Sequence, residues 1–454
     1  MQQSVFDSVV IGAGIIGIAT AYYLKKLDPA LRVALVERGQ PMAFTSAQSG
    51  ENYRNWWPHP VMTAFTDHSI ELMEQIALNT DNHINMTRGG YALATRAAEI
   101  QQLTRELYTG YANIDASDIR FHEAGLRNNY EPPFQSTWDL SPSGVDVLLD
   151  QELINSTFPS FAKDIRCVVH IRRAGSISSQ QLGQLMLEDF RAAGGQLINA
   201  VIEDITVSNG FELLTTIPNT KFRASKIVNA AGPFASSIAA MLGIELPVQN
   251  SLQQKIAFPD EHGAIPRNMP FSIDLDAQQI DWSEEERELV AADPKLARLA
   301  GAMPGAIHCR PDGGDQSTWV RLGWAFGETG EVPQLDPPST DHFPEVVLRG
   351  AARLNPLLKQ YYGRLPRNMH HYSGYYTTTE ENWPLIGELS VEGAYYVGAM
   401  SGFGTMSACA AGELCAQQVL GTELPDYAQA LSLERYKNEE LMAEISTLSS
   451  RGIL

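Results

Sequence analysis

The segment VVIGAGIIG, residues 9–17, constrains the fold of this chain more than any other. It starts with a continuous apolar run, which is typical of a buried parallel strand, and Gly12, Gly14 and Gly17 follow with the spacing GxGxxG. The first glycine of such a unit permits a tight turn, the second lets a diphosphate approach the backbone, and the third lets a helix pack closely on the strand. The helix N–H groups that begin at Ile15 would then face the diphosphate. The pattern therefore predicts a strand, turn and helix that bind a dinucleotide.

A single GxGxxG is weak support for such a site, and the next strand strengthens it. The stretch RVALVE has the pattern of a second apolar strand and ends in Glu37, at the expected distance of about 20 residues beyond the last glycine. A carboxylate at this spacing binds the ribose hydroxyls of adenosine and favours an unphosphorylated ribose, as in NAD or FAD. A glycine-rich strand–helix–strand unit without a ligand is the alternative.

Length and charge narrow the class of protein further. The chain has 454 residues, of which 44% are hydrophobic, and this predicts two domains or one large domain with an elaborate second layer. It carries 53 acidic and 33 basic side chains, a net charge of −20, so its surface repels nucleic-acid phosphates and anionic lipid. The longest apolar run, Val9 to Leu24, is shorter than the roughly 20 residues of a membrane helix. We therefore predict neither nucleic-acid binding nor a transmembrane segment.

The cysteines point to a reducing compartment. Cys167, Cys309, Cys409 and Cys415 form no CxxC pair and no metal-ligand spacing, which favours free, mostly buried thiols and no metal site. The opening residues MQQSVFD lack the basic region of a signal peptide. We therefore expect a cytoplasmic protein.

Two later segments repeat the order of strand, small-residue turn and helix. In residues 215–243 an apolar strand leads into the small residues Ala231 and Gly232, which permit close approach of a ligand. In residues 392–421 the strand AYYVGA leads through SGFG into an alanine-rich helix. The N–H groups at the start of that helix would face an electron-rich group.

These blocks resemble the D-amino-acid oxidase superfamily of flavoproteins, which includes glycine oxidase, sarcosine oxidase and dimethylglycine dehydrogenase. The most specific part is YYTTTEENWPLIGEL followed by AYYVGAMSGFGTMSACAAGEL. The resemblance implies an α/β fold of mixed α+β type. A Rossmann-like FAD-binding domain would be joined to a second domain, built on a large, mainly antiparallel sheet that faces the flavin. The first domain would comprise residues 1–84, 165–247 and 367–454, and the second residues 85–164 and 248–366.

The resemblance also implies how an extended FAD would lie. Glu37 would hold the adenosine ribose, while the other contacts would follow the cofactor from adenine to flavin. At the flavin ring, backbone N–H groups would face the pyrimidine oxygen, where negative charge grows on reduction. The remaining predicted FAD contacts are Gly12, Gly14, Ile15, Gly17, Arg38, Ser46, Ser49, Gly50, Ile202, Ala231, Gly232, Gly402, Phe403, Gly404 and Thr405.

Two departures from the family predict non-covalent FAD. One family attachment uses a histidine at a place that here holds Gly50 or Glu51, and another uses a cysteine where this chain has Gly374. Neither glycine nor glutamate offers the attaching atom.

The stretch SGENYRNWWPHP places Arg54 among Tyr53, Trp56 and Trp57. Similar arginines in sarcosine oxidases stand by the flavin ring or bind the substrate carboxylate. The planar guanidinium suits that role because it binds a carboxylate through two parallel hydrogen bonds, and the aromatic rings would wall or stack on it. The alternative is a structural arginine on a tryptophan-rich patch between the domains.

Further candidates for the active site come from residues 305–326, which we expect to form two strands joined by a Pro-Asp-Gly-Gly turn. His308, Arg310 and Arg321 would line the site, with His308 as a hydrogen-bonded core histidine in the alternative. By the resemblance, Arg321 stands where sarcosine oxidases hold a lysine that helps the reduced flavin react with oxygen, which leaves oxidase or dehydrogenase activity open. On a later strand we expect Tyr376 as a substrate contact, since its neighbour would point to the other face.

The expected chemistry is oxidation of the C–N bond of a secondary amine or an amino acid, N-substituted or of D configuration. A hydride passes to flavin N5, and the imine is then hydrolysed. Alternatives are an FAD-dependent 2-hydroxy acid or glycerol-phosphate dehydrogenase, or a flavin-binding subunit of a hetero-oligomeric dehydrogenase. The electron acceptor would be oxygen or a protein or quinone carrier, and an oligomer or a partner subunit is compatible with each alternative.

Overall fold

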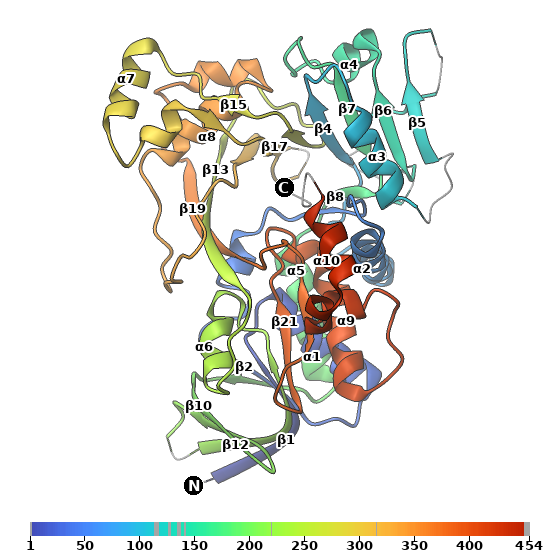
Figure 1. Cartoon of the computed structure of the whole chain (residues 1–454), viewed down its shortest axis with the longest axis vertical. Coiled ribbons are helices and arrows are strands. Elements are labelled where there is room, and N and C mark those ends of the chain that lie inside the picture. The colour runs from blue at the N-terminus through green and yellow to red at the C-terminus, as the bar shows by residue number, and fades with distance from the viewer. Residues whose placement is uncertain are drawn as a thin grey trace.

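The computed structural model describes residues 2–112, 118–125, 129–133, 138–139, 142–218, 220–314 and 316–448. Two large β-sheets organise this part of the chain. In Figure 1 the first sheet lies in the lower half of the molecule, and the second spreads across the top.

The first sheet has eight strands around a parallel core. Its strands are β1 (Gln2–Ile11), β2 (Val33–Glu37), β9 (Gln196–Asn199), β10 (Ile202–Ser208), β11 (Gly210–Thr215), β12 (Thr220–Asn229), β20 (Leu385–Glu388) and β21 (Ala394–Gly398). β1 runs parallel to β2 on one side and to β12 on the other, and the end of β12 pairs in parallel with β21. This confirms the strand, turn and helix predicted around the GxGxxG spacing and the Rossmann-like order.

Both faces of this sheet are buried at its central strands, which explains the continuous apolar runs of β1, β2 and β21. Val10 and Leu35 pack in a core with α1 (Ile15–Leu27), α2 (Pro60–Asn79), α5 (Ser179–Ala192) and α9 (Gly404–Leu420). Val9 and Ile11 pack in another core with α6 (Ala235–Ala240). Figure 1 shows the two helical layers on opposite sides of the strands. Successive side chains of each central strand thus point alternately into these two apolar cores.

Small residues let α1 and α9 pack closely. A Cβ at Gly412 would lie 2.6 Å from the backbone carbon of Ala19, and α9 is otherwise rich in buried alanine. Close packing of this kind requires small side chains at the contact. The alanine-rich composition of α9 therefore reflects its close packing against α1.

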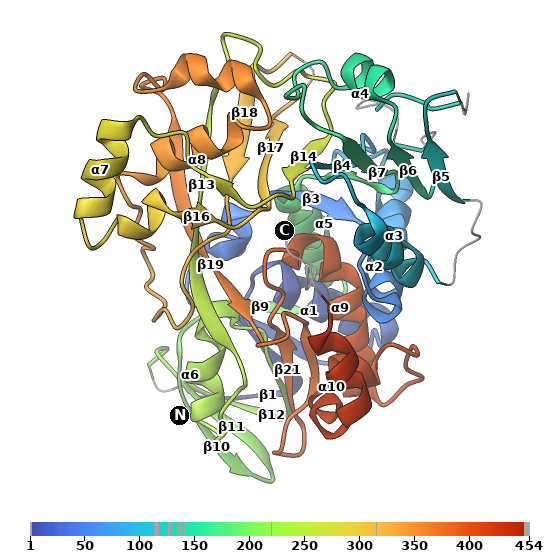
Figure 2. The same ribbon diagram turned by 45° about the horizontal axis from the view of Figure 1, so that its top comes forward.

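The second sheet has nine strands, mainly antiparallel. In spatial order they are β19 (His370–Thr378), β13 (Gln249–Pro259), β18 (Trp319–Gly323), β17 (Ile307–Pro311), β14 (Phe271–Asp274), β4 (Tyr91–Thr95), β7 (Cys167–Ile171), β6 (Val145–Leu148) and β5 (Ile119–His122). Figure 2 shows the sheet passing over the first domain from β19 to β5. The strand pair predicted in residues 305–326 is confirmed as β17 and β18.

Alternating side chains of this sheet also enter two cores. Tyr91 and Leu93 belong to the inner core, which includes Trp56 of the first domain. Ala92 and Ala94 belong to the outer core, which is covered by helices α4 (Gln151–Thr157) and α8 (Phe343–Ala351). We call the face that carries Tyr91 the inner face. By strand register it also carries Lys255, His308, Arg310 and Arg321.

Two predicted domain boundaries require correction. From the sequence we expect residues 167–171 and 370–378 in the cofactor domain, but they form β7 and β19 of the second sheet. Each strand pairs along its whole length with second-sheet strands, β7 with β4 and β6, and β19 with β13. An apolar or aromatic strand pattern does not specify its pairing partner, because the partner lies far away in sequence. The chain therefore crosses between domains at other points.

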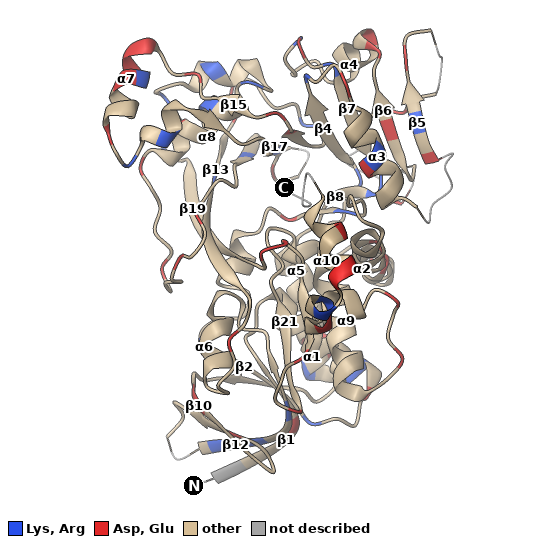
Figure 3. Ribbon diagram, in the orientation of Figure 1, with Lys and Arg blue, Asp and Glu red and all other residues tan. Residues whose placement is uncertain are grey.

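The remaining elements are short. They are the strand pairs β3 (Asn52–Arg54) with β8 (Ala174–Ser176) and β15 (Gln278–Gln279) with β16 (Ala302–Met303), and the helices α3 (Gln101–Gly110), α7 (Glu284–Ala292) and α10 (Glu439–Ser446). Helix α7 projects at the edge of the second domain with acidic side chains in its first turn (Figure 3). All four cysteines are buried. Within the described residues, no helix is both long and apolar enough to cross a membrane.

A buried histidine on the outer face of the second sheet is held in its neutral form. His170 Nε2 lies 3.0 Å from the Gly89 carbonyl oxygen, and Arg172 donates to Nδ1 at 2.7 Å. Burial, followed by the charge of Arg172, lowers the pKa of His170 to about 3. This geometry satisfies the neutral imidazole, in which Nε2 donates to the Gly89 carbonyl oxygen and Nδ1 accepts from Arg172.

We expect the fold to lose stability as the pH falls below about 6.5, partly through His170. The unfolded imidazole binds a proton near its ordinary pKa of 6.5, whereas the folded one does so only near 3, so unfolding takes up a proton in this interval. Thermal unfolding at pH 7 and at about pH 5 measures the effect. His170→Gln should reduce the drop in melting temperature between the two pH values, and an unchanged drop would contradict this assignment.

Candidate active site

A cavity of about 550 Å³ opens at the carboxyl ends of the parallel strands of the first sheet. Its wall includes the residues that follow β1, β2, β12 and β21, where ligands of doubly wound sheets bind. Lys255 and residues 374–377 of the second sheet complete the wall on the other side. The cavity thus lies where the two domains meet.

The glycines of the first turn set the depth of this cavity. Gly12 has a φ of +104°, and a Cβ there would lie 2.6 Å from the Ala230 carbonyl oxygen. A Cβ at Gly17 would lie 1.8 Å from the Gly12 carbonyl oxygen. Gly12 and Gly14 line the cavity and Gly17 does not. Gly17 therefore acts by letting α1 approach β1, and its place among the direct contacts is corrected.

Two helices begin at the cavity without capping side chains at their N-cap positions. Gly14 precedes α1 and Phe403 precedes α9, and neither first turn contains an acidic residue. Around α1, Glu37 accepts from the Ala13 N–H at 2.7 Å, and Ser46 Oγ accepts from the Ile15 N–H at 3.0 Å. The positive ends of both helix dipoles thus face the same cavity.

One end of the cavity has the features of an adenosine site. Glu37 borders it, with its second carboxylate oxygen accepting from the Gly39 N–H at 2.9 Å. The Arg38 guanidinium carbon lies 4.8 Å from the Phe234 ring centroid, and both residues line the wall. Ile202 lies nearby on the same wall. A carboxylate beside a flat apolar and cationic wall suits a ribose and a purine ring.

The other end is bordered by the start of α9. Ser49 Oγ and Thr405 Oγ1 lie 2.7 Å apart, and a Cβ at Gly402 would lie 2.7 Å from the Tyr376 ring. Phe403 is not in the wall; its ring packs edge-on against Trp57 with centroids 4.6 Å apart. The predicted contacts that line the cavity are Gly12, Gly14, Ile15, Glu37, Arg38, Ser46, Ser49, Gly50, Ile202, Ala231, Gly232, Gly402, Gly404 and Thr405.

Arg54 does not line the cavity; it lies in a buried aromatic cluster that reaches this end through Trp57 and Phe403. Its guanidinium carbon is 4.7 Å from the Trp57 ring, 5.9 Å from Trp56 and 5.8 Å from Tyr91. The predicted stacking on the paired tryptophans is confirmed, and Tyr91 comes from the second sheet. Burial lowers the pKa of Arg54 to about 10, so the guanidinium remains charged at neutral pH.

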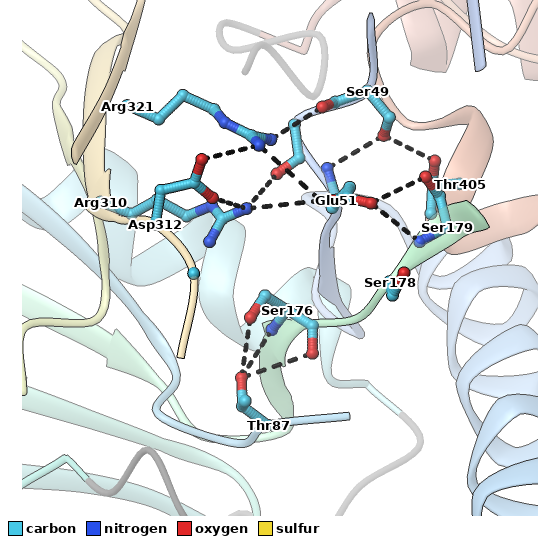
Figure 4. A network of polar contacts seen from close by, with 12 residues as sticks. Ser49, Glu51, Thr87, Ser176, Ser178, Ser179, Arg310, Asp312, Arg321 and Thr405 are labelled. Atoms are coloured by element: carbon cyan, nitrogen blue, oxygen red, sulfur yellow. Dashed lines mark hydrogen bonds and ion pairs between the residues drawn. The ribbon is translucent and has the colours of Figure 1, made fainter. Parts of the chain in front are cut away.

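Arg310 and Arg321 do not line the cavity; they form an ion-pair network beside it (Figure 4). Asp312 lies 3.0 Å from an Arg310 nitrogen and 2.9 Å from an Arg321 nitrogen. Burial alone would raise the pKa of Asp312, but the two guanidinium groups outweigh it and hold that pKa below its ordinary value. The network reaches Glu51, at 3.9 and 3.8 Å from the two arginines. Both cations are thus committed to carboxylates.

His308 and the tyrosines differ in their relation to the cavity. His308 packs against Gly323 and Phe271 and does not line the wall. Burial, then the charge of Lys255, lowers the pKa of His308 to about 4. Tyr376 lines the cavity, and so do its neighbours over residues 374–377. Successive side chains of a strand point to opposite faces, so residues 374–377 cannot all reach the cavity through their side chains. The backbone of the strand therefore borders the cavity there.

Lys255 is a cavity-lining residue that the sequence analysis does not predict. It lies beside Tyr376 at the end of the cavity bordered by the start of α9, which we call the flavin end because the flavin ring is expected there. It is 6% exposed, and its Nζ lies 5.4 Å from the Tyr376 ring centroid. The signal was present in the strand QNSLQQKIAFP, where Ser251, Gln253 and Lys255 alternate on one face. Only the pairing of this strand with β19 reveals that the face borders the cavity.

Comparison with known proteins agrees with this geometry. The family model DAO, FAD dependent oxidoreductase, matches residues 7–418. Dimethylglycine dehydrogenase of mouse mitochondria is 22% identical over 439 residues, covering 95% of this chain and 44% of that protein. The chain therefore spans less than half the length of this curated relative.

Solved structures share the fold at low sequence identity. Glycine oxidase from Geobacillus kaustophilus has a TM-score of 0.70 and 18% identity, covering 95% of this chain and 99% of that one. L-Proline dehydrogenase from P. horikoshii has a TM-score of 0.72 and 17% identity, covering 97% and 100%. With the family model matching most of its length, the chain belongs to the DAO family of FAD dependent oxidoreductases.

The residues present fit FAD. The helix N-terminus of α1 suits the diphosphate, Glu37 suits the ribose, and the N-terminus of α9 suits the flavin oxygen that becomes more negative on reduction. When bound, FAD supplies the two-electron acceptor that protein side chains lack. The chain is thus an FAD dependent oxidoreductase by family, and its cavity offers groups that suit each part of this cofactor.

We expect Gly17→Ala to weaken FAD binding roughly tenfold or more, because the new methyl group would displace the Gly12 carbonyl from the turn. Titration of the apoprotein with FAD, followed by quenching of flavin fluorescence, measures the affinity. Gly301→Ala is the matched control, since a Cβ there meets only the Arg298 carbonyl oxygen at 3.5 Å and the residue does not line the cavity. Equal affinities for the two variants would contradict the packing role of Gly17.

We expect His308→Gln to leave the shape of the pH profile of kcat/KM unchanged between about pH 6 and about pH 9. The imidazole has a pKa of about 4 and therefore carries no charge over this range. Steady-state kinetics of both proteins measure the profile. Loss of an inflection near neutral pH in the variant would show that His308 titrates during the reaction.

Proposed function

We propose that the enzyme oxidises the C–N bond of a substrate that carries a carboxylate. This substrate is a secondary amine or an amino acid that is N-substituted or of D configuration. The hydride on the carbon beside nitrogen passes to FAD, and water hydrolyses the resulting imine. The names of the relatives support this choice, because glycine, dimethylglycine and L-proline all carry a carboxylate beside an amine.

The observation that carries the proposal is the buried cation beside the flavin end of the cavity. Trp57 connects Arg54 to this end, since it touches both the guanidinium and Phe403, which stands between two cavity-lining glycines. On the side of the second sheet, the Tyr91 ring lies 5.8 Å from the guanidinium carbon. A carboxylate reaching the guanidinium would therefore hold the adjacent carbon near the flavin.

The surroundings of Arg54 favour such a role. A guanidinium offers a planar pair of donors to a carboxylate, and the low-dielectric aromatic walls strengthen the attraction. Trp56 and Trp57 are buried beside the guanidinium and form apolar walls around the charge. This combination fits a substrate with a carboxylate at one end and an apolar N-substituent or side chain at the other.

The first test is anaerobic absorbance of the FAD-loaded enzyme with a panel of substrates. Bleaching of the flavin band by N-alkyl or D-amino acids supports the proposal, and admission of air then shows whether oxygen accepts the electrons. Bleaching only by 2-hydroxy acids or glycerol phosphate would replace it with the alternative chemistry. Reduction that requires an added protein would favour a subunit of a larger dehydrogenase.

We expect Arg54→Met to raise KM for a carboxylated substrate by about 10- to 100-fold. A hydrogen-bonded charged group contributes about 1.5–3 kcal/mol, and each 1.4 kcal/mol is about tenfold. The readout is the ratio of kcat/KM for an amino acid and for the same amine without its carboxylate. This ratio should collapse in Arg54→Met and recover partly in Arg54→Lys.

Arg298→Met serves as the control for loss of an arginine, since Arg298 is largely exposed and pairs with Glu328 far from the cavity wall. It should leave the substrate ratio unchanged. If Arg54→Met lowers activity toward both substrates equally, the residue has only a structural role and the recognition step is wrong.

A further inference from the structure

Three cations of the second sheet contact three consecutive carbonyl groups of the first domain. The carbonyls belong to residues 48–50, which border the flavin end of the cavity. Lys255 donates to the first at 3.2 Å, Arg321 to the second at 2.9 Å and Arg310 to the third at 3.1 Å. The three donors come from the adjacent strands β13, β18 and β17 and share the inner face of the sheet.

Two of these cations are neutralised by carboxylates. Arg310 and Arg321 both pair with Asp312, and Glu51 lies within 4 Å of both (Figure 4). Glu51 is held in place because its other carboxylate oxygen accepts from the Ser179 N–H and hydroxyl, each at 3.0 Å. The two arginines therefore contribute little net charge to the cavity.

Lys255 differs in charge balance and in position. It alone of the three lines the cavity. Its contacts are the Gln48 carbonyl oxygen and the ring of Tyr376. Among the residues that the structure describes, no carboxylate forms an ion pair with it, and the side chain is nonetheless buried. A buried ammonium group without an opposite charge is costly, so its site is suited to an anion.

The reaction itself creates an anion at this place. Hydride transfer moves two electrons and one proton from the substrate carbon to the cofactor. The substrate becomes more positive by one charge and the cofactor more negative by one. A fixed cation in a site of low dielectric constant stabilises the negative product more than the neutral starting form.

We propose that Lys255 stabilises the negative charge of the reduced cofactor and so raises the reduction potential of the bound FAD. This inference rests on the FAD cofactor of the family and is independent of the proposed substrate. Arg310 and Arg321 hold the 48–50 segment against the second sheet, whereas Lys255 supplies the uncompensated charge.

The test is the midpoint potential of bound FAD in the wild type and in Lys255→Met, measured by reductive titration against a reference dye without substrate. We expect the variant to lose at least tenfold in the equilibrium constant for reduction, which is about 30 mV for a two-electron couple. Lys255→Arg should restore most of the shift. Lys359→Met is the matched control, because Lys359 is 55% exposed and pairs with Asp281.

Poor folding or loss of FAD is handled by a second variant and a second measurement. Lys255→Gln keeps a polar group that can donate to the Gln48 carbonyl and removes only the charge. If FAD dissociates, the ratio of apoprotein affinities for reduced and oxidised FAD gives the same shift by linkage. A shift in this ratio by tenfold or more supports the proposal.

An unchanged potential in both Lys255 variants overturns the proposal. In that case, titration with acetate, followed by the flavin absorbance band, identifies the other use of the charge. Loss of an acetate response in Lys255→Met with an unchanged potential would assign Lys255 to the substrate carboxylate. An acetate response lost only in Arg54→Met would leave carboxylate recognition with Arg54.

Discussion

The close approach of β1, α1 and the turn after β12 is the constraint on which the rest of the site depends. A single methyl group at Gly17 would lie 1.8 Å from the Gly12 carbonyl oxygen, and one at Gly12 would lie 2.6 Å from the Ala230 carbonyl oxygen. Because both positions hold glycine, which has no such methyl group, the backbone can bring the start of α1 to the ends of the parallel strands. This creates the cavity and aims helix N–H groups into it.

The second constraint is electrostatic. The chain carries a net charge of −20, yet the inner face of its second sheet concentrates cations toward the cavity. Asp312 and Glu51 neutralise Arg310 and Arg321, so these two arginines serve mainly to join the domains. The uncompensated Lys255 and the aromatic surroundings of Arg54 provide the charges that anions at the flavin end would meet. The positive charge that the inner face offers to the cavity thus depends on which of its cations are paired with carboxylates.

Local patterns predicted the elements around the cofactor because each signal lies within one short segment. The glycine spacing, the acid at Glu37 and the small-residue turn into α9 all remain in the positions expected, and most of the predicted contacts line the cavity. Gly17 and Phe403 are the exceptions. Phe403 precedes the helix in sequence, but its side chain turns back onto Trp57, and sequence spacing does not contain that direction.

The sequence by itself determined the class of fold, the glycine turn that follows β1 and the two tryptophan partners of Arg54, because these depend on neighbours along the chain. Tertiary structure alone decided which strands join the second sheet and which inner-face cation reaches the cavity. Arg310, Arg321 and Lys255 lie on three adjacent strands, and their access to the cavity depends on their contacts with residues 48–50 and on the carboxylate of Glu51. Pairing across more than 200 residues sets both, as the contact of Lys255 with Gln48 illustrates, and such long-range pairing leaves no local pattern.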